Sequence, residues 1–406
     1  MPKDTYHGPL EKVNDCCWRI PKSYKQGMRV DGLIYANDDL IELIKADQAP
    51  EQVANVAFLP GIQHASLAMP DIHWGYGFCI GGVCATDPNE GGVISPGGVG
   101  YDINCGVRLV RSNLFYQDVK PQLKPLVEEL FRRVPTGVGR EGKYHFDPKE
   151  LRRLMAEGPS RLVERGWATP GDIDHTEARG RLDGAEPENV SDRALERGKD
   201  QCGTLGSGNH FMEVQVVDAV FDDEAARAMG LEKDMVCVMV HSGSRGLGYQ
   251  VCDDALKLLR GVPEKYGISL PDRQLACAPV ESPEGRHYLG AMRAAANYAW
   301  CNRQLLMWQA REAFENVFGQ PWQELKMNLV YDVAHNIAKF EEHAIGGVSR
   351  RVWVHRKGAT RAFPNQPVFI PGSMGTASYF LLGQQAAMRD TFGSACHGAG
   401  RVLSRS

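Results

Sequence analysis

The chain has 406 residues, and its 46 basic and 50 acidic side chains give a formal net charge of −4. This length can bury a large core, and the hydrophobic and charged fractions, 43% and 24%, are those of an ordinary soluble globular protein. The near-balanced charge gives no indication of a globally basic, nucleic-acid-binding surface, so any such surface has to be local.

The elements predicted in chain order are mixed helices and strands. Helices are expected at 37–46 with Asn37 as N-cap, at 119–134, from Asp147 onward through the capped segment 147–150, and at 287–318. Short strands and turns are expected within 80–110, and strands at 211–217, 235–240, 328–333, 351–355, 368–370 and 379–382. The order predicts an α+β fold, a single large mixed domain of short strands and helices around a central metal site.

Residues 135–205 are polar, charged and rich in glycine, so they predict a mobile insertion that faces the substrate. Eleven cysteines occur without any Cys-x-x-Cys pair. The chain also lacks a signal-like N-terminus and any apolar stretch of about 18 residues. These features predict a reducing, cytoplasmic location with free thiols.

Five side chains are candidate metal ligands, each in a Gly-rich or strand-ending segment: Asp102, Cys105, His210, His241 and His335. A lone histidine after a strand is more often a hydrogen-bonded core residue, and a lone cysteine a buried apolar thiol. The recurrence of the pattern weakens those interpretations. A structural zinc site, the next alternative, usually closes at short regular spacing, whereas these residues are far apart and include a carboxylate. The set therefore favours an open, working site, in which Cys105 could bridge two metals, although ligand types alone do not identify the metal.

Candidate phosphate contacts lie near turning glycines. Ser373 and Ser378 offer hydroxyls and backbone N–H groups, and Asn209, Asn336 and Arg245 could add donors. His397 lies between Cys396 and Gly398, with Arg401 downstream. From chemistry alone, a nucleophile, a metal ligand and a core histidine remain equally open for His397.

Eight motifs in order resemble the RtcB-type RNA-splicing ligases over nearly the whole chain. They are Met69-Pro-Asp71-Ile-His73, Gly100-Tyr-Asp102-Ile-Asn-Cys105-Gly-Val-Arg108, Gly203-Thr-Leu-Gly-Ser-Gly-Asn209-His210-Phe, His241-Ser-Gly-Ser-Arg-Gly, Ala334-His335-Asn336, Arg356-Lys357-Gly-Ala-Thr, Pro371-Gly-Ser373-Met-Gly and His397-Gly-Ala-Gly-Arg401. Such ligases join RNA that ends in a 3′-phosphate or 2′,3′-cyclic phosphate to RNA with a 5′-hydroxyl, using GTP and Mn²⁺.

The resemblance implies a role for each matching residue. The five ligand candidates would bind two Mn²⁺ ions, with Cys105 bridging, and His397 would attack the GTP α-phosphate to form a guanylyl-histidine. The nucleotide would be held by Asn209, His210, Glu213, His335, Asn336, Pro371, Gly372, Ser373, Met374, Ser378, His397, Gly398, Ala399 and Gly400. RNA contacts are expected from Arg197, from Arg245 and from the basic run 350–361, which begins with Arg350 and Arg351. An archease-type protein would assist turnover.

One departure from the family concerns the C-terminus. Members continue for dozens of residues beyond the His397 motif to a terminal lysine that contacts guanine, whereas this sequence stops at Ser406. The sequence is therefore expected to lack part of the guanine pocket. Two alternative functions remain: a metal-dependent phosphodiesterase that acts on RNA ends and needs no covalent His397, and a catalytically impaired protein that only binds such ends because it lost catalysis with its tail.

Overall fold

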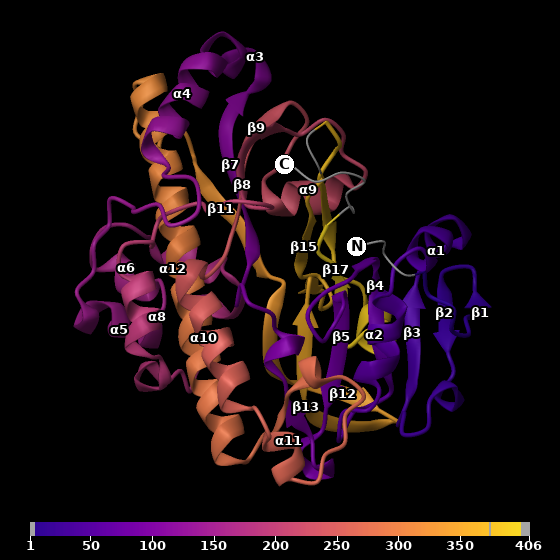
Figure 1. Cartoon of the computed structure of the whole chain (residues 1–406). Coiled ribbons are helices and arrows are strands. Elements are labelled where there is room, and N and C mark those ends of the chain that lie inside the picture. Colours follow the sequence, from indigo (N-terminus) through magenta and orange to yellow (C-terminus); the bar gives the residue numbers. More distant parts are fainter. Residues whose placement is uncertain (1–4, 373–374, 399–406) are drawn as a thin grey trace. The chain divides into compact units, whose positions relative to one another are not determined.

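The computed structural model describes residues 5–372 and 375–398, whose helices and strands are labelled in Figure 1. They fall into two compact units. The first takes in residues 5–101, 252–289 and 335–398, and the second takes in residues 102–251 and 290–334. Both helices and strands occur throughout, so the predicted α+β class is confirmed.

A seven-stranded sheet dominates the first unit, in the order β1-β2-β3-β4-β5-β13-β12. Its strands are β1 (Glu11–Asn14), β2 (Cys17–Ile20), β3 (Asp31–Tyr35), β4 (Ala65–His73), β5 (Ile80–Thr86), β13 (Val348–Lys357) and β12 (Asn336–Ile345). Neighbours are antiparallel except β3 and β4, which are parallel and therefore need a crossover. That crossover contains α1 (Asp38–Lys45) and α2 (Ala49–Val56).

Both crossover helices pack on the sheet through one apolar cluster. Ile41 of α1 and Val53 of α2 are almost fully buried against Ile34 of β3 and Ala68 of β4. The side chain of Asn37 accepts a hydrogen bond from the backbone N–H of Leu40, so the predicted N-cap is confirmed. Smaller elements complete the unit, namely β6 (Val93–Ile94), β10 (Ala278–Pro279), β14 (Ala359–Arg361), β15 (Pro367–Ile370), β16 (Tyr379–Leu382), β17 (Ser394–Cys396), α11 (Val262–Lys265) and α13 (Gln385–Asp390).

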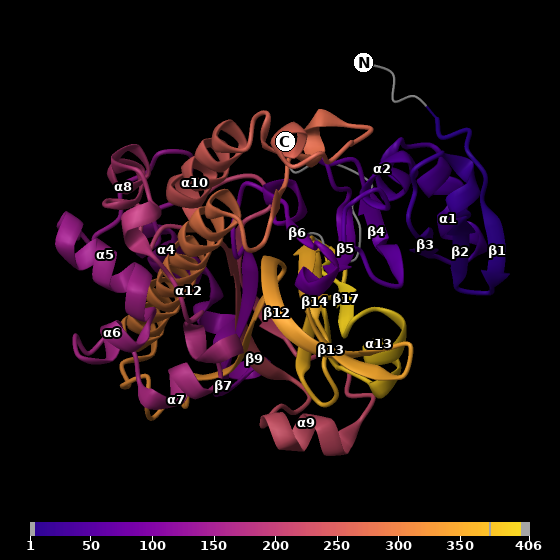
Figure 2. The ribbon, with the colours of Figure 1, turned by 90° about the horizontal axis from the view of Figure 1, so that it is seen from below.

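The second unit is built on a four-stranded antiparallel sheet in the order β11-β7-β9-β8. The strands are β11 (Asn328–Ala334), β7 (Gly106–Phe115), β9 (Met235–Ser242) and β8 (Phe211–Val216). Figure 2 shows the long helix α12 (Pro283–Phe318) beside β7 and β9. Leu306, Ala310 and Phe314 of this helix share a buried cluster with Val110 of β7 and Val238 of β9.

Residues 135–205 form a series of short helices in the second unit. They are α5 (Pro148–Glu157), α6 (Ser160–Val163), α7 (Pro170–Asp174), η5 (Glu177–Gly180), η6 (Pro187–Asn189) and α8 (Asp192–Gly198). Asp147 caps α5 as predicted, while Thr169 and Ser191 cap α7 and α8. The role of this segment as a mobile insertion stays a prediction.

Most predicted elements are confirmed within about two residues, except that α12 and β13 extend further and the helix predicted at 119–134 begins only at Leu123. The remaining α-helices are α3 (Tyr116–Val119), α4 (Leu123–Arg133), α9 (Asp223–Met229) and α10 (Arg245–Leu258). In the seven-stranded sheet, β1, β2, β3, β4 and β12 were not predicted. Within residues 5–372 and 375–398, no helix combines the length and apolar character that crossing a membrane requires.

Candidate metal centre

The register of the four-stranded sheet brings the histidine and cysteine candidates to one end. Gly106, the first residue of β7, pairs with Ala334 of β11 on one side and with Ser242 of β9 on the other. Phe211, the first residue of β8, pairs with His241. Because Cys105, His210 and His335 each lie one residue outside these pairs, backbone hydrogen bonding alone aligns four candidates at the same end of the sheet.

A tight turn before β7 carries Asp102 and Cys105. The backbone N–H of Cys105 donates to the carbonyl of Asp102 at 2.9 Å. Asn104 takes a left-handed backbone conformation with φ of 53°, which asparagine tolerates better than most residues. The turn reverses the chain so that the carboxylate of Asp102 and the thiol of Cys105 can reach the same neighbour, His210.

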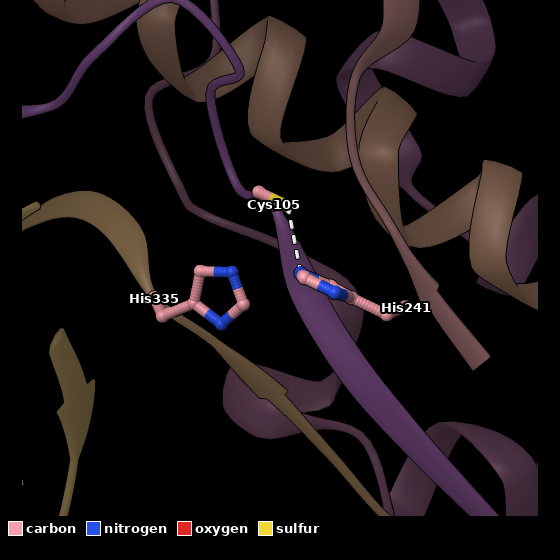
Figure 3. Close-up of side chains that lie close together, drawn as sticks. All are labelled: Cys105, His241 and His335. Atoms are coloured by element: carbon pink, nitrogen blue, oxygen red, sulfur yellow. Dashed lines mark hydrogen bonds between the residues drawn. The ribbon is translucent and has the colours of Figure 1, made fainter. Parts of the chain in front are cut away.

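Cys105, His241 and His335 form the first group of candidate ligands (Figure 3). Each offers one ligand atom, and these atoms lie within 4.8 Å of one another. Sγ of Cys105 is 3.2 Å from Nε2 of His241. His335 directly follows Ala334, so the last pair of the β11–β7 ladder leads the chain to it. All three residues are buried.

Asp102, Cys105 and His210 form the second group, whose ligand atoms also lie within 4.8 Å of one another and which shares the thiol with the first group. Nε2 of His210 lies 2.8 Å from Oδ2 of Asp102 and 3.4 Å from Sγ of Cys105. The opposite ring nitrogen, Nδ1, is 3.0 Å from the carbonyl oxygen of Leu205. A carbonyl only accepts, so Nδ1 carries a proton and donates it there, and Nε2 is the ring nitrogen that a metal ion would bind in this cluster.

Burial and charge shape the protonation of the shared groups. Burial acts to raise the pKa of Asp102, but the neighbouring His210 and Arg245 outweigh it and lower this pKa to about 2. Burial and the Asp102 carboxylate raise the pKa of the Cys105 thiol well above its ordinary value. A divalent cation deprotonates a thiol that coordinates it, so an anionic Cys105 in this setting needs a cation beside it.

The residues fit a divalent transition metal by the chemistry of their donors. Imidazole nitrogen, thiolate sulfur and carboxylate oxygen together are typical of such ions, whereas calcium and magnesium prefer oxygen alone. Two groups that share Cys105 also match two ions bridged by one thiolate. The structure brings the five predicted ligands together in these groups, and their role as ligands remains a prediction.

His397, the predicted nucleophile, is held by Asp71 within the first unit. Nδ1 of His397 lies 2.7 Å from Oδ2 of Asp71, and the same oxygen accepts the backbone N–H groups of His397 and Gly398 at 3.2 and 3.1 Å. The rings of His397 and His335 have centroids 4.8 Å apart. Asp71 belongs to the first of the eight family motifs, but its separation of 326 residues from His397 means that sequence patterns could not predict this contact.

The predicted nucleotide-binding residues are distributed over both units. In the first, Oδ1 of Asn336 accepts from the N–H of Gly358 at 2.8 Å, and Oγ of Ser378 accepts from the N–H of Gly372 at 3.0 Å. In the second, Asn209 is exposed and Glu213 accepts from Gln215. Four of the predicted residues, Ser373, Met374, Ala399 and Gly400, lie outside the described residues, as do Arg401 and Arg405.

Only some of the basic side chains in the run 350–361 are exposed to solvent. Arg356 is fully buried in a bidentate ion pair with Glu341, so the interpretation of the whole run as an RNA contact is wrong for this residue. Lys357 is also buried, and its Nζ donates to the carbonyls of Tyr76 and Phe78.

The other predicted RNA contacts differ in accessibility. Arg351 is exposed over the ring of Phe340, Arg197 is exposed beside Tyr249, and Arg350 forms ion pairs with Asp87 and Glu90. Arg245 is half-buried, and its guanidinium donates to Thr204 Oγ1 and to the carbonyl of Gly137.

Comparison with known proteins gives consistent matches over nearly the full chain. A family model described as tRNA-splicing ligase RtcB matches residues 52–406. A protein of that name from Archaeoglobus fulgidus is 56% identical over 98% of this chain and 85% of its own length. Proteins of the same name from Thermococcus kodakarensis and Methanococcus maripaludis are each 53% identical over the same shares.

Proposed function

We propose that this chain, which belongs to the RtcB family of tRNA-splicing ligases, is an RNA ligase that uses GTP and Mn²⁺. It would join an RNA 3′-phosphate or 2′,3′-cyclic phosphate end to a 5′-hydroxyl end. Family membership supports RNA ligation, and the ligand cluster supports dependence on a metal. The observation that carries the finer chemistry is the 4.8 Å separation of the His335 and His397 rings, which puts a candidate nucleophile beside a candidate metal ligand.

The proposed first step is attack by Nε2 of His397 on the α-phosphorus of GTP. A bond forms between this nitrogen and phosphorus, the bond to the β-phosphate oxygen breaks, and pyrophosphate leaves. The Asp71 carboxylate at 2.7 Å keeps the proton on Nδ1 and so leaves the lone pair on Nε2. Cations held by Asp102, Cys105, His210, His241 and His335 would supply positive charge to the phosphate oxygens.

The guanylyl group then passes from His397 to the RNA 3′-phosphate, and the imidazole regains its lone pair. The 5′-hydroxyl of the second RNA attacks that phosphate, GMP leaves, and the hydroxyl proton is lost to solvent. A 2′,3′-cyclic phosphate first needs opening by water to a 3′-phosphate. These ends are read through phosphate more than through bases, so we expect little sequence specificity.

The remaining assignments belong to this proposal. We place the reaction in the cytoplasm, supported by eleven free cysteines, and we expect an archease-type activator to assist turnover. The RNA strand would contact Arg197, Arg245, Arg350 and Arg351. Of these, the exposed Arg197 and Arg351 are the best placed to contact a phosphate backbone.

The test is covalent labelling with [α-³²P]GTP in the presence of Mn²⁺. We expect a labelled protein whose bond is labile in acid and stable in base, as a phosphoramidate is. His397→Ala should abolish the label, whereas His145→Ala, which changes an exposed histidine beside Asp200, should not. Full labelling of the His397 variant would overturn the assignment of the nucleophile.

Product analysis separates ligation from the alternatives. A joined strand that requires GTP supports the proposal. A dephosphorylated or opened end without a GTP requirement indicates a phosphodiesterase instead. Salt-sensitive binding of RNA 3′-phosphate ends, with neither product nor label, indicates a protein that only binds them.

A further inference from the structure

Arg303 of α12 is completely buried in the second unit, and all five of its N–H groups are used. Its Nε and one Nη2 hydrogen donate to the two oxygens of Asp332, each at 2.8 Å. The other donors reach Asn104, at the carbonyl (2.6 Å) and at Oδ1 (3.0 Å), and the carbonyl of Ser242 (3.0 Å). A buried cation with this many partners fixes the separation of the groups that accept from it.

The two backbone acceptors flank candidate metal ligands. Asn104 immediately precedes Cys105, and Ser242 immediately follows His241. Asn104 is itself held in its left-handed conformation, because its Nδ2 donates to the carbonyl of Ala296 at 2.7 Å while Arg303 donates to both of its oxygens. One guanidinium thus connects the turn that carries the thiol to the strand end that carries the imidazole.

The third acceptor anchors the guanidinium to the sheet. Asp332 on β11 also accepts from Nε of Arg108 at 2.8 Å and from Nε1 of Trp300 at 3.1 Å. A Cβ atom on Gly106, the residue after Cys105, would lie 2.8 Å from Cζ of Arg303, so the guanidinium packs directly on that backbone. Both observations mean that Arg303 cannot shift without moving the start of β7.

We propose that Arg303 is a positioning residue, which clamps the Asn104–Cys105 turn against the Ser242 end of β9 and so sets the distance between the thiol and the His241 imidazole. The inference rests on the metal site of the proposed function. Arginine is needed because a planar fork can serve a carboxylate and three further acceptors at once. A lysine ammonium keeps the charge but has three donors at one point.

The chain offers a matched control in Arg311, eight residues further along α12. It is 1% exposed and forms a bidentate ion pair with Asp172 at 2.7 and 2.8 Å, but its other partners are the carbonyl of Met327 and the rings of Trp308 and Trp322, none of them adjacent in sequence to a candidate ligand. Arg303→Lys and Arg311→Lys therefore perturb similar buried pairs, and only the first loosens the candidate ligands.

The experiment measures Mn²⁺ binding to the full chain without GTP or RNA, by the electron paramagnetic resonance signal of free Mn²⁺, together with thermal unfolding. Replacing Arg303 by lysine should weaken Mn²⁺ binding by about 10- to 100-fold, the usual effect of losing a partner that orients ligands. It should also weaken the thiolate-to-metal absorption band of the Co²⁺-substituted protein. Arg311→Lys should lower the melting temperature by a similar amount and keep wild-type affinity and spectrum. Equal Mn²⁺ affinity in Arg303→Lys and wild type, or an equal loss in both variants, would overturn the proposal.

If Arg303→Lys does not fold, a second variant, Asn104→Gly, tests the proposed clamp. Asn104→Gly accepts the left-handed backbone and keeps the carbonyl acceptor, but loses the amide that ties the turn to Arg303 and Ala296. Severalfold weaker Mn²⁺ binding with a native melting curve supports the clamp, and unchanged binding refutes it. Because neither readout involves GTP, failure here leaves the guanylylation test unaffected, and absent guanylylation in the wild type leaves this test readable.

Discussion

One carboxylate oxygen of Asp71 contacts both the imidazole Nδ1 and the backbone N–H of His397. This arrangement fixes the ring position and its tautomer together. An amide in place of the carboxylate could turn its NH₂ group toward Nδ1, which would shift the ring proton to Nε2 and remove the nucleophilic lone pair.

Asp71→Asn should therefore reduce guanylylation of His397 by about 100-fold or more, in line with other histidines that lose an orienting carboxylate. The rate of label incorporation from [α-³²P]GTP measures this. Asp15→Asn, at a fully exposed carboxylate, serves as the control and should keep the wild-type rate. A wild-type rate in Asp71→Asn would show that the tautomer is set elsewhere.

Gly243→Ala should weaken Mn²⁺ binding, because a Cβ atom at this position would overlap the carboxylate of Asp102. That carboxylate also accepts the N–H of Ser244 at 2.9 Å, so it has little room to move aside. We expect at least tenfold weaker binding by the same resonance assay. Gly171→Ala is the matched control, since its Cβ would meet only Thr169 Oγ1, at 3.7 Å. Comparable affinities in the two variants would contradict the role of Asp102 as a ligand.

His355 should make the fold sensitive to mild acid. It is fully buried, burial lowers its pKa to about 4, and its Nε2 accepts the backbone N–H of Ser95. Between about pH 6.5 and 4 the unfolded chain binds this proton and the folded chain does not, so stability falls as pH falls through that window. This pKa shift corresponds to a loss of at most about 3 kcal/mol in the free energy of unfolding across that pH window.

Urea unfolding at several pH values tests this effect against His355→Gln. The wild type should lose more free energy of unfolding than the variant between pH 6.5 and 4, because the variant lacks the titrating ring. If the free energy of unfolding falls equally with pH in the two proteins, His355 does not cause the loss of stability in acid.

Glu341→Gln should destabilise the first unit by about 3 kcal/mol, because it leaves the buried Arg356 without its counter-charge. Both oxygens of Glu341 accept from Arg356, at 2.9 and 2.7 Å. Chemical denaturation measures the loss, and Glu342→Gln, on the exposed side of the same strand, should change little. A loss below about 1 kcal/mol would mean that water reaches the guanidinium.

Sequence patterns predicted the ends of strands well, and with them the candidate ligands. His241 ends an apolar run and His335 follows another, so their positions could be inferred from period and composition. The pairing of Gly106 with both Ala334 and Ser242 could not be inferred in this way, because the register depends on hydrogen bonds between segments more than 100 residues apart.

The missed features have specific physical reasons. The charged residues Lys339 and Glu341 are buried in β12 and interrupt its apolar pattern, so the sequence did not predict a strand there. Residues 135–205 contain good N-caps at Thr169 and Ser191, but the helices after them have seven residues or fewer, too short for a periodic signal. The buried state of Arg356 depends on Glu341, fifteen residues away on a neighbouring strand.

The shared register at Gly106 has a consequence for how a cation would act on the fold. Two ions that share Cys105, one held also by His210 and the other also by His241, would link three neighbouring strand ends, in addition to the hydrogen bonds between these strands and the contacts of Arg303. Such ends fray first in a sheet, so loading the site should slow amide hydrogen exchange at the starts of β7 and β8 and at the end of β9. The bound metal would then stabilise the end of the sheet in addition to its role in the reaction.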